Sequence, residues 1–259
     1  MIYFVGAGCG APDLITVRGQ RLLEKADVVI YAGSLVNPAL LEVCKPQCRI
    51  YNSAEMTLDE VLQVMTEAAG KLVVRLHTGD PSLYGAIQEQ MDALDKVELA
   101  YEVCPGVSSM SGAAAALKRE YTLPGVSQSV IVCRMEGRTA VPEREQLAAL
   151  AAHQATMVIF LSAGLTQQVQ NALLAGGYAA DTPAAIVYKA SWPDEAIYRC
   201  TVGTLAATAQ ANAISKTALL LVGSFLDSRY ELSRLYAADF ATAYRPVKEQ
   251  DGGDAHEEN

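Results

Sequence analysis

Short runs of β-branched and apolar residues alternate with longer segments of helical periodicity along most of this chain of 259 residues. The alternation predicts an α/β fold with a largely parallel sheet, because strand–helix–strand units return the chain to the same sheet edge. We expect strands at residues 2–5, 27–31, 49–51, 71–76, 99–103, 129–133, 156–161, 184–188, 198–201 and 218–222. We expect helices at residues 17–25, 38–43, 58–69, 83–94, 108–118, 143–152, 166–175 and 204–211. Thr57 and Glu60 at the start of the third helix match a capping box.

The alternation breaks at residues 120–125, which read Glu-Tyr-Thr-Leu-Pro-Gly, and then resumes. The break predicts two α/β domains, residues 1–122 and residues 123–245, with a hinge near residues 119–127. A cleft between two domains is a favoured place for a small ligand. Residues 246–259 hold five acidic residues and one lysine, which is typical of a disordered acidic tail.

Charge and composition exclude several classes of function. The net charge is −9 and no basic stripe is present, which argues against a nucleic-acid partner. No apolar run approaches the ~20 residues of a membrane-spanning helix. The first residues lack the basic segment followed by an apolar segment that is typical of a signal peptide. We therefore expect a cytoplasmic protein without a membrane partner. Cys44 and Cys48 form a C-x3-C pair without a matching second pair, so reduced thiols and no metal site are expected.

The first strand is followed by Gly6-Ala7-Gly8-Cys9-Gly10-Ala11, which fits the loose dinucleotide-binding pattern. Two features weaken that interpretation. Pro12 and Asp13 interrupt the turn, so the next helix is expected to begin only after Thr16. The acidic residue that binds the ribose hydroxyls is expected about 20 positions after the loop, but Ile30 and Tyr31 stand there. A purely structural glycine loop and a ligand-binding loop both remain open, and a nucleotide-dependent oxidoreductase is the alternative from another class.

Two more strand-to-helix junctions carry glycine and polar residues. The first is His77–Gly85, in which Asp80 or Ser82 could cap the next helix or face a ligand. The second is Cys104–Ser109, whose two serines could do the same. Glycine-bearing turns at three strand ends of one sheet predict a concave rim of backbone groups, which suits a nucleoside-like ligand.

Several motifs in chain order resemble the tetrapyrrole (class III) methyltransferases. Common to that family are Val5–Gly8, Pro12–Thr16, Gly79–Pro81 and Pro105–Ser108. The segments similar to its precorrin-4 C11-methylating branch are Tyr31–Val36, Glu136–Thr139, Val141–Glu143, Phe160–Gly164 and Tyr188–Pro193. The resemblance implies two αβα domains, a homodimer, and transfer of a methyl group from S-adenosyl-methionine to C11 of (cobalt-)precorrin-4 in cobalamin biosynthesis. Precorrin-3B C17- and uroporphyrinogen-III methyltransferases are the alternatives within the family.

The resemblance also implies site residues. The cofactor-binding residues would be Gly79, Asp80, Pro81, Leu83, Tyr84, Ser108, Ser109, Leu161, Ser162, Ala190, Thr217 and Ala218. Those facing the corrin precursor, with or without cobalt, would be Gly8, Gly33 and Ser34. A corrin precursor carries several carboxylates, so an acidic protein must present local cations to bind it. Arg134 and Arg138, near the domain junction, are the candidates for this role. Asp80 is the candidate catalytic residue, as an acceptor or relay for a proton of the macrocycle.

Three residues depart from the family pattern. Cys9 and Ala11 replace the proline and the aspartate of the usual Gly-Pro-Gly-Asp-Pro loop, so contacts that need those side chains are in doubt. Cys133 replaces the threonine that usually precedes Arg134.

Overall fold

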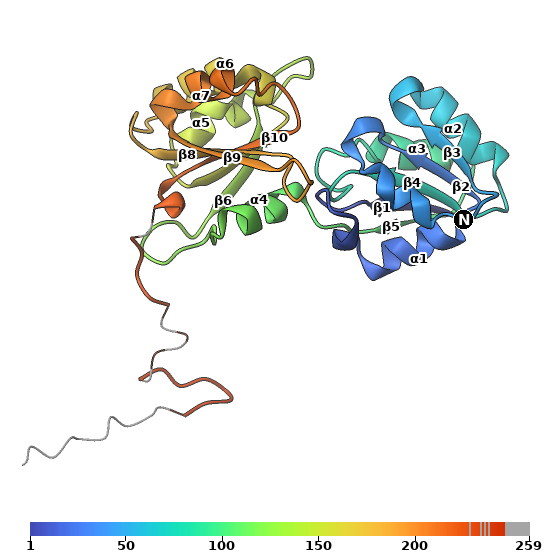
Figure 1. Ribbon diagram of the computed structural model, residues 1–259, viewed down its shortest axis with the longest axis horizontal. Helices are drawn as coiled ribbons and strands as arrows, with labels where there is room; N and C mark the ends of the chain where they lie inside the picture. Colours follow the sequence, from blue (N-terminus) through green and yellow to red (C-terminus); the bar gives the residue numbers. More distant parts are fainter. Residues whose placement is uncertain (228, 234, 236, 238, 247–259) are drawn as a thin grey trace, which may run out of the picture.

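The computed structural model describes residues 1–246 except 228, 234, 236 and 238, and it forms two α/β lobes that lie side by side (Figure 1). The first lobe contains β1 (Ile2–Gly6), α1 (Val17–Lys25), β2 (Val28–Tyr31), β3 (Arg49–Asn52), α2 (Leu58–Glu67), β4 (Val73–His77), α3 (Gln88–Lys96) and β5 (Tyr101–Cys104). The second contains α4 (Ser109–Leu117), β6 (Val130–Arg134), α5 (Leu147–Ala151), β7 (Thr156–Phe160), α6 (Thr166–Ala175), β8 (Pro183–Tyr188), β9 (Ala196–Thr201), α7 (Leu205–Ala211) and β10 (Ala218–Val222). Short 3-10 helices occur at Pro12–Leu14, Gly33–Leu35, Pro38–Val43, Ser53–Glu55, Glu143–Glu145, Ala163–Leu165, Val202–Thr204 and Ser224–Leu226. The predicted acidic tail lies, from residue 247 onward, outside the described residues.

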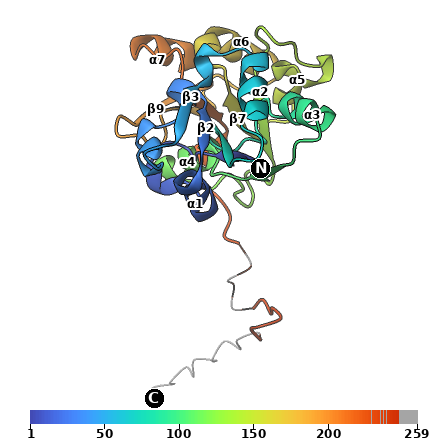
Figure 2. The same ribbon diagram turned by 90° about the vertical axis from the view of Figure 1, so that its right-hand side faces the viewer.

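The first sheet is entirely parallel, with strand order β3-β2-β4-β1-β5. Its three central strands, β2, β4 and β1, are therefore buried between helices on both faces. One face packs against α1 through residues such as Leu23 and Leu76, and the other packs against α2 and α3 through Met65 and Leu94 (Figure 2). The order places the carboxyl ends of β4, β1 and β5 next to one another, where an α/β sheet offers a ligand crevice.

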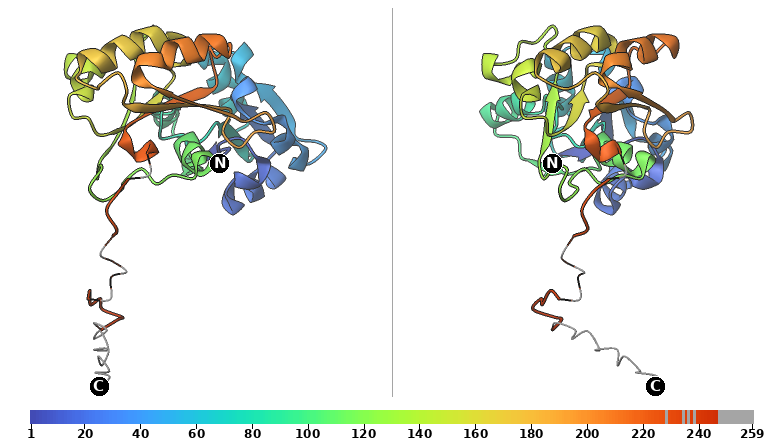
Figure 3. Two further views of the ribbon diagram at one scale, coloured as in Figure 1. Left: turned by 60° about the vertical axis from the view of Figure 1, so that its left-hand side comes forward. Right: turned by 90° about the vertical axis from the view of Figure 1, so that its left-hand side faces the viewer.

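The second sheet is mixed, with strand order β6-β7-β10-β8-β9, and among its neighbouring strands only the pair β6 and β7 is parallel. This sheet belongs to the lobe coloured from green to orange in Figure 3. The expectation of a largely parallel sheet is therefore wrong for this lobe. The segment 189–195 between β8 and β9 is too short for the crossover that parallel strands require, so these strands form a hairpin.

Both lobes have the expected αβα layering, and the predicted fold class is confirmed. In the second lobe α5, α6 and α7 cover one face of the sheet (Figure 1). Helix α4 covers the other face, where Ala113 and Leu117 contact Val158 and Leu219. Helix α4 thus packs on the second sheet, although it precedes residue 122. The domain boundary at residue 122 remains a prediction.

Local sequence signals place some helix ends well and one poorly. The capping box of α2 is present, since Glu60 accepts from the Thr57 N–H at 2.6 Å and the Glu60 N–H donates to Thr57 Oγ1 at 3.3 Å. Helix α3 begins at Gln88 instead of residue 83, which corrects the prediction. The cause is a left-handed backbone at Tyr84 and Ala86, with φ of 58° and 49°, which an α-helix cannot contain.

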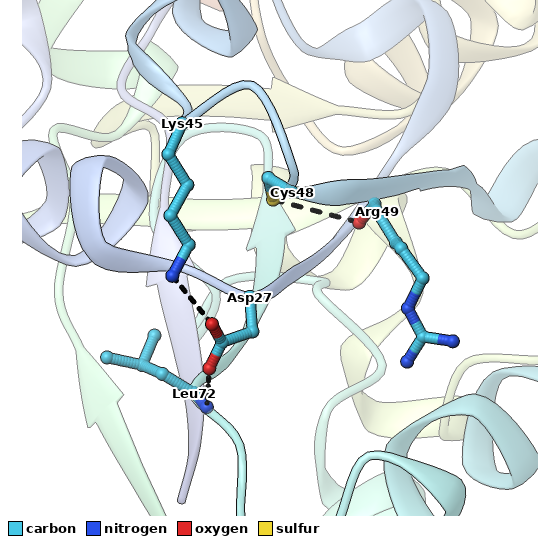
Figure 4. Close-up of polar contacts among 5 residues, drawn as sticks. All are labelled: Asp27, Lys45, Cys48, Arg49 and Leu72. Atoms are coloured by element: carbon cyan, nitrogen blue, oxygen red, sulfur yellow. Dashed lines mark hydrogen bonds and ion pairs between the residues drawn. The ribbon is translucent and has the colours of Figure 1, made fainter.

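The amino ends of the strands in the first lobe are held by Asp27. Its carboxylate pairs with Lys45 at 2.6 Å and accepts from the Leu72 N–H at 2.9 Å (Figure 4). Cys44 and Cys48 flank this lysine, and burial together with Cys48 raises the pKa of the Cys44 thiol to about 11. In the described part of the chain, no group of three or more His, Cys, Asp or Glu is placed to hold a metal ion. No described helix is long and apolar enough to cross a membrane.

Candidate active site between the two lobes

The loops that follow β1, β4 and β5 contact one another through their backbones. The Gly79 N–H donates to Gly8 O at 2.8 Å and the Gly8 N–H donates to Gly79 O at 3.3 Å. A Cβ at Gly106 would lie 2.2 Å from Gly79 O, and one at Gly6 would lie 2.5 Å from Gly106 Cα. Glycine is therefore required at this junction, because no side chain fits between the loops.

Asp80 joins two of these loops. Its Oδ2 accepts from the Gly106 N–H at 2.8 Å, and its Oδ1 accepts from the Ser82 N–H at 2.8 Å and from the Ser82 hydroxyl. Partial burial alone would raise the pKa of this carboxyl, but the bonds from Ser82 and Gly106 outweigh it and hold the pKa below its usual value. Neither Asp80 nor Ser82 caps α3, whose first turn has no side-chain cap.

A cavity of about 390 Å³ lies where these loops face the second lobe. Ten of the twelve predicted cofactor residues line it: Gly79, Asp80, Leu83, Tyr84, Ser108, Ser109, Leu161, Ala190, Thr217 and Ala218. Pro81 and Ser162 do not line it. Ser162 is fully buried, where its hydroxyl donates to Phe160 O at 2.6 Å and accepts from the Met135 N–H at 2.8 Å, so its role is to brace the chain behind the cavity.

Strained backbone is concentrated around this cavity. Tyr84, Leu161, Lys189 and Thr217 all line it and all have a left-handed conformation, with φ of 58°, 52°, 46° and 54°. Such a conformation costs a non-glycine residue on the order of 1–3 kcal/mol and tends to gather at functional sites.

The hairpin loop between β8 and β9 closes the cavity from the second lobe. Ser191 Oγ donates to Cys9 Sγ at 3.3 Å and accepts from the Ala11 N–H at 3.0 Å. Gly10 faces the Trp192 indole so closely that a Cβ there would lie 2.2 Å from the ring. Cys9 and Ala11 replace the proline and the aspartate that are usual in the family. They thus connect the first loop to the second lobe, Cys9 through its thiol and Ala11 through its backbone N–H.

Sequence reasoning did not name as site residues part of the cavity wall: Cys9, Leu35, Thr78, Phe160, Ala163, Gly164, Val187, Lys189, Trp192, Ser215, Lys216 and Leu219. The Lys189 ammonium lies 5.3 Å from the Trp192 ring centroid and 2.6 Å from the Asp194 carboxylate. The sequence signal for this region was the family-like segment Tyr188–Pro193, which contains the single tryptophan of the chain.

A larger cavity of about 770 Å³ adjoins the first. Its wall comes mainly from β6 and the segment after it, and it shares only Tyr84 and Leu161 with the smaller cavity. Of the predicted substrate residues, Arg134 and Arg138 line the larger cavity and Ser34 lines the smaller one. Gly8 and Gly33 line neither cavity.

The two arginines differ in their partners. The Arg134 guanidinium donates to the carbonyl oxygens of Thr139 and Ala140 at 2.9 and 2.8 Å, so it holds the segment 135–140 in place. Arg138 is exposed at the wall of the larger cavity and has no hydrogen bond or ion pair within the described residues. Burial raises the pKa of the neighbouring Cys133 thiol to about 12, which keeps it protonated.

Fold and site together define a two-lobed α/β protein with one cavity for a small ligand between its lobes and a larger cavity beside it. The family described as tetrapyrrole (corrin/porphyrin) methylases matches residues 1–206, so the chain belongs to this family of methyltransferases. The predicted resemblance is thereby confirmed.

The chain is 52% identical to cobalt-precorrin-4 C(11)-methyltransferase of Methanocaldococcus jannaschii, over 94% of this chain and 95% of the relative. The crystal structure of a cobalt precorrin-4 methyltransferase superimposes with a TM-score of 0.85 at 48% identity, covering 88% of this chain and 96% of the other. A uroporphyrin-III C-methyl transferase from Thermus thermophilus in complex with S-adenyl homocysteine has a TM-score of 0.71 at 25% identity, covering 87% and 93%.

Proposed function

We propose that this protein transfers a methyl group from S-adenosyl-methionine to C11 of precorrin-4 or its cobalt complex, in cobalamin biosynthesis. The observation that carries the proposal is 52% identity, over nearly the full length of both chains, to an enzyme named for this reaction. The motifs of the sequence analysis that are specific to this branch, such as Glu136–Thr139 and Phe160–Gly164, lie at the two cavities and support the same substrate.

The smaller cavity suits S-adenosyl-methionine. Its volume of about 390 Å³ falls in the range of small-molecule sites. Its wall combines backbone groups at Gly79, the hydroxyls of Ser108 and Ser109, and apolar surface from Phe160 and Leu161. Such a mixture fits a nucleoside joined to an amino acid, and the cofactor would supply an electrophilic methyl group on sulfur.

The protein contributes alignment and the exclusion of water. Holding the two reactants in line can supply ~7–11 kcal/mol of the barrier, so no strong side-chain nucleophile is needed. We propose that Asp80 acts mainly by holding the loops after β4 and β5 together, because its bonds to Gly106 and Ser82 occupy both oxygens. A lowered pKa makes it a poor proton acceptor, which lowers the support for its predicted role as a base.

The larger cavity would hold the macrocycle. Arg138 is the cation with free donors at its wall, and a guanidinium binds carboxylates with two parallel hydrogen bonds. Arg134 would shape the same wall by holding the segment 135–140.

Mass spectrometry of the products tests the proposal. The protein is incubated with S-adenosyl-methionine and a tetramethylated corrin precursor, with and without cobalt, and fragmentation locates the new methyl group. Addition at C11 is expected. Addition at C17, or methylation of uroporphyrinogen III instead, would replace the proposal with one of the other activities in the family.

We also propose that the enzyme is a cytoplasmic homodimer. All six cysteines are free thiols, which is usual for a protein in a reducing compartment. Light scattering on the purified protein tests the dimer directly.

A further inference from the structure

Tyr84 and Leu161 are the two residues common to both cavities, and each comes from a different lobe. Tyr84 lies in the loop between β4 and α3, and Leu161 is the residue that follows β7. The Tyr84 ring lies 5.5 Å from the Phe160 ring, so the two lobes meet at this pair. These two side chains therefore lie where the walls of the two cavities meet.

Both residues expose their side chains at the boundary. Leu161 is 67% exposed and Tyr84 is 43% exposed, although both are apolar or aromatic. Partial burial raises the pKa of the Tyr84 phenol, and Cys133 and Glu145 raise it further against an opposing effect of Arg134. Those three residues line the larger cavity, as Tyr84 itself does.

The backbone at both positions is left-handed, with φ of 58° for Tyr84 and 52° for Leu161. Glycine would adopt this conformation without strain. Strain of this kind tends to gather at functional sites, and here it occurs at both residues that the two cavities share.

We propose that Tyr84 and Leu161 form a size-limiting aperture between the two cavities, which admits a methyl group and hinders larger alkyl groups. This inference rests on the proposed function, in which the smaller cavity holds the sulfonium and the larger one the macrocycle. The ring carbon forms the new carbon–carbon bond as the carbon–sulfur bond breaks with its electron pair left on sulfur. The macrocycle then releases a proton to water. In-line transfer places the reacting atoms about 3–3.5 Å apart, so the migrating carbon lies at the aperture.

The experiment compares wild type with Leu161→Gly, which removes the side chain and suits the left-handed backbone. Isothermal calorimetry measures Kd for S-adenosyl-homocysteine, S-adenosyl-methionine and S-adenosyl-ethionine. The Kd for S-adenosyl-homocysteine, which has no alkyl group on sulfur, measures how much cofactor contact the variant loses apart from any effect of alkyl size. The ratio of the ethionine to the methionine Kd should fall at least about tenfold, and the rate of ethyl transfer relative to methyl transfer should rise with it.

Glu98→Gly is the matched control, because Glu98 is exposed, has φ of 54° and lines neither cavity. Its Kd ratio should equal that of wild type. Tyr84→Gly opens the aperture from the other lobe and should act in the same direction, which keeps the test valid if Leu161→Gly does not fold.

An unchanged Kd ratio in the folded aperture variants overturns the inference, as does an equal change in Glu98→Gly. The Kd ratios are measured without any tetrapyrrole. A wild-type protein that methylates no corrin precursor would therefore overturn the proposed function separately from the aperture.

Discussion

The Gly106 N–H donates a 2.8 Å hydrogen bond to Oδ2 of Asp80, and this bond ties the loop after β5 to the loop after β4. Gly106 also packs its Cα against Gly6, so the loop after β1 is part of the same unit. One wall of the smaller cavity therefore depends on a junction between three segments that are far apart in the sequence.

Asp80→Asn should weaken this junction. An amide offers one acceptor oxygen, so its NH2 group would face either the Gly106 N–H or the donors of Ser82. We expect a loss of about 1–3 kcal/mol in the free energy of unfolding and weaker binding of S-adenosyl-homocysteine. Urea unfolding and calorimetry measure both, and Asp181→Asn on the surface is the control.

The effect of Asp80→Asn should also depend on pH. The folded pKa of Asp80 is lowered, so its stabilisation is complete above the unfolded pKa of about 3.9 and is lost as the pH falls through the folded value. The stability difference between mutant and wild type should then shrink in acid. A kcat at saturating substrates that falls ~10²-fold without loss of stability would instead support the role as a proton acceptor.

His77 should make the protein sensitive to acid. Its ring is 4% exposed, its Nε2 has no hydrogen-bond partner within the described residues, and burial together with Arg75 lowers its pKa to about 3. Between about pH 6.5 and pH 3 the unfolded chain binds a proton that the folded chain does not, so stability falls as the pH decreases through this range. His77→Leu should flatten the decrease in melting temperature from pH 7 to pH 4.5, and His153→Leu on the surface should not.

Gly106→Ala should disrupt the loop junction. The new methyl group would meet the Gly79 carbonyl at 2.2 Å, and two backbones must separate to admit it. We expect a loss of about 3 kcal/mol, at the upper end for an overpacked site, together with much weaker cofactor binding. Gly137→Ala, where the nearest atom is 3.9 Å away, is the control and should leave the melting temperature unchanged.

Arg138→Ala and Arg134→Ala should separate substrate binding from loop support. Arg138 has no partner within the described residues, so its removal should raise the KM for the corrin precursor about tenfold, equivalent to about 1.4 kcal/mol, without changing the melting temperature. Arg134 holds the carbonyls of Thr139 and Ala140, so its removal should lower stability as well. Equal effects of both variants on stability and KM would contradict this division of roles.

Local patterns in the sequence determined the elements of this fold. The bounds of α1 and α6 match their predictions, since helical periodicity and a cap such as Thr16 act within a few residues. The three glycine turns were also visible, because glycine at a strand end is a local signal of a close approach or an unusual φ. The family resemblance supplied eleven of the 23 residues that line the smaller cavity.

The tertiary structure decided what local signals do not encode. Strands β8, β9 and β10 run antiparallel to their neighbours, and periodicity is the same for either direction. The late start of α3 follows from the strained turn at Tyr84, which the contacts between lobes maintain. Ser162 follows β7 and is buried behind the cavity, whereas Lys189 follows β8 and lines it. Their positions depend on the order of the strands in the second sheet, which arises from contacts between distant segments.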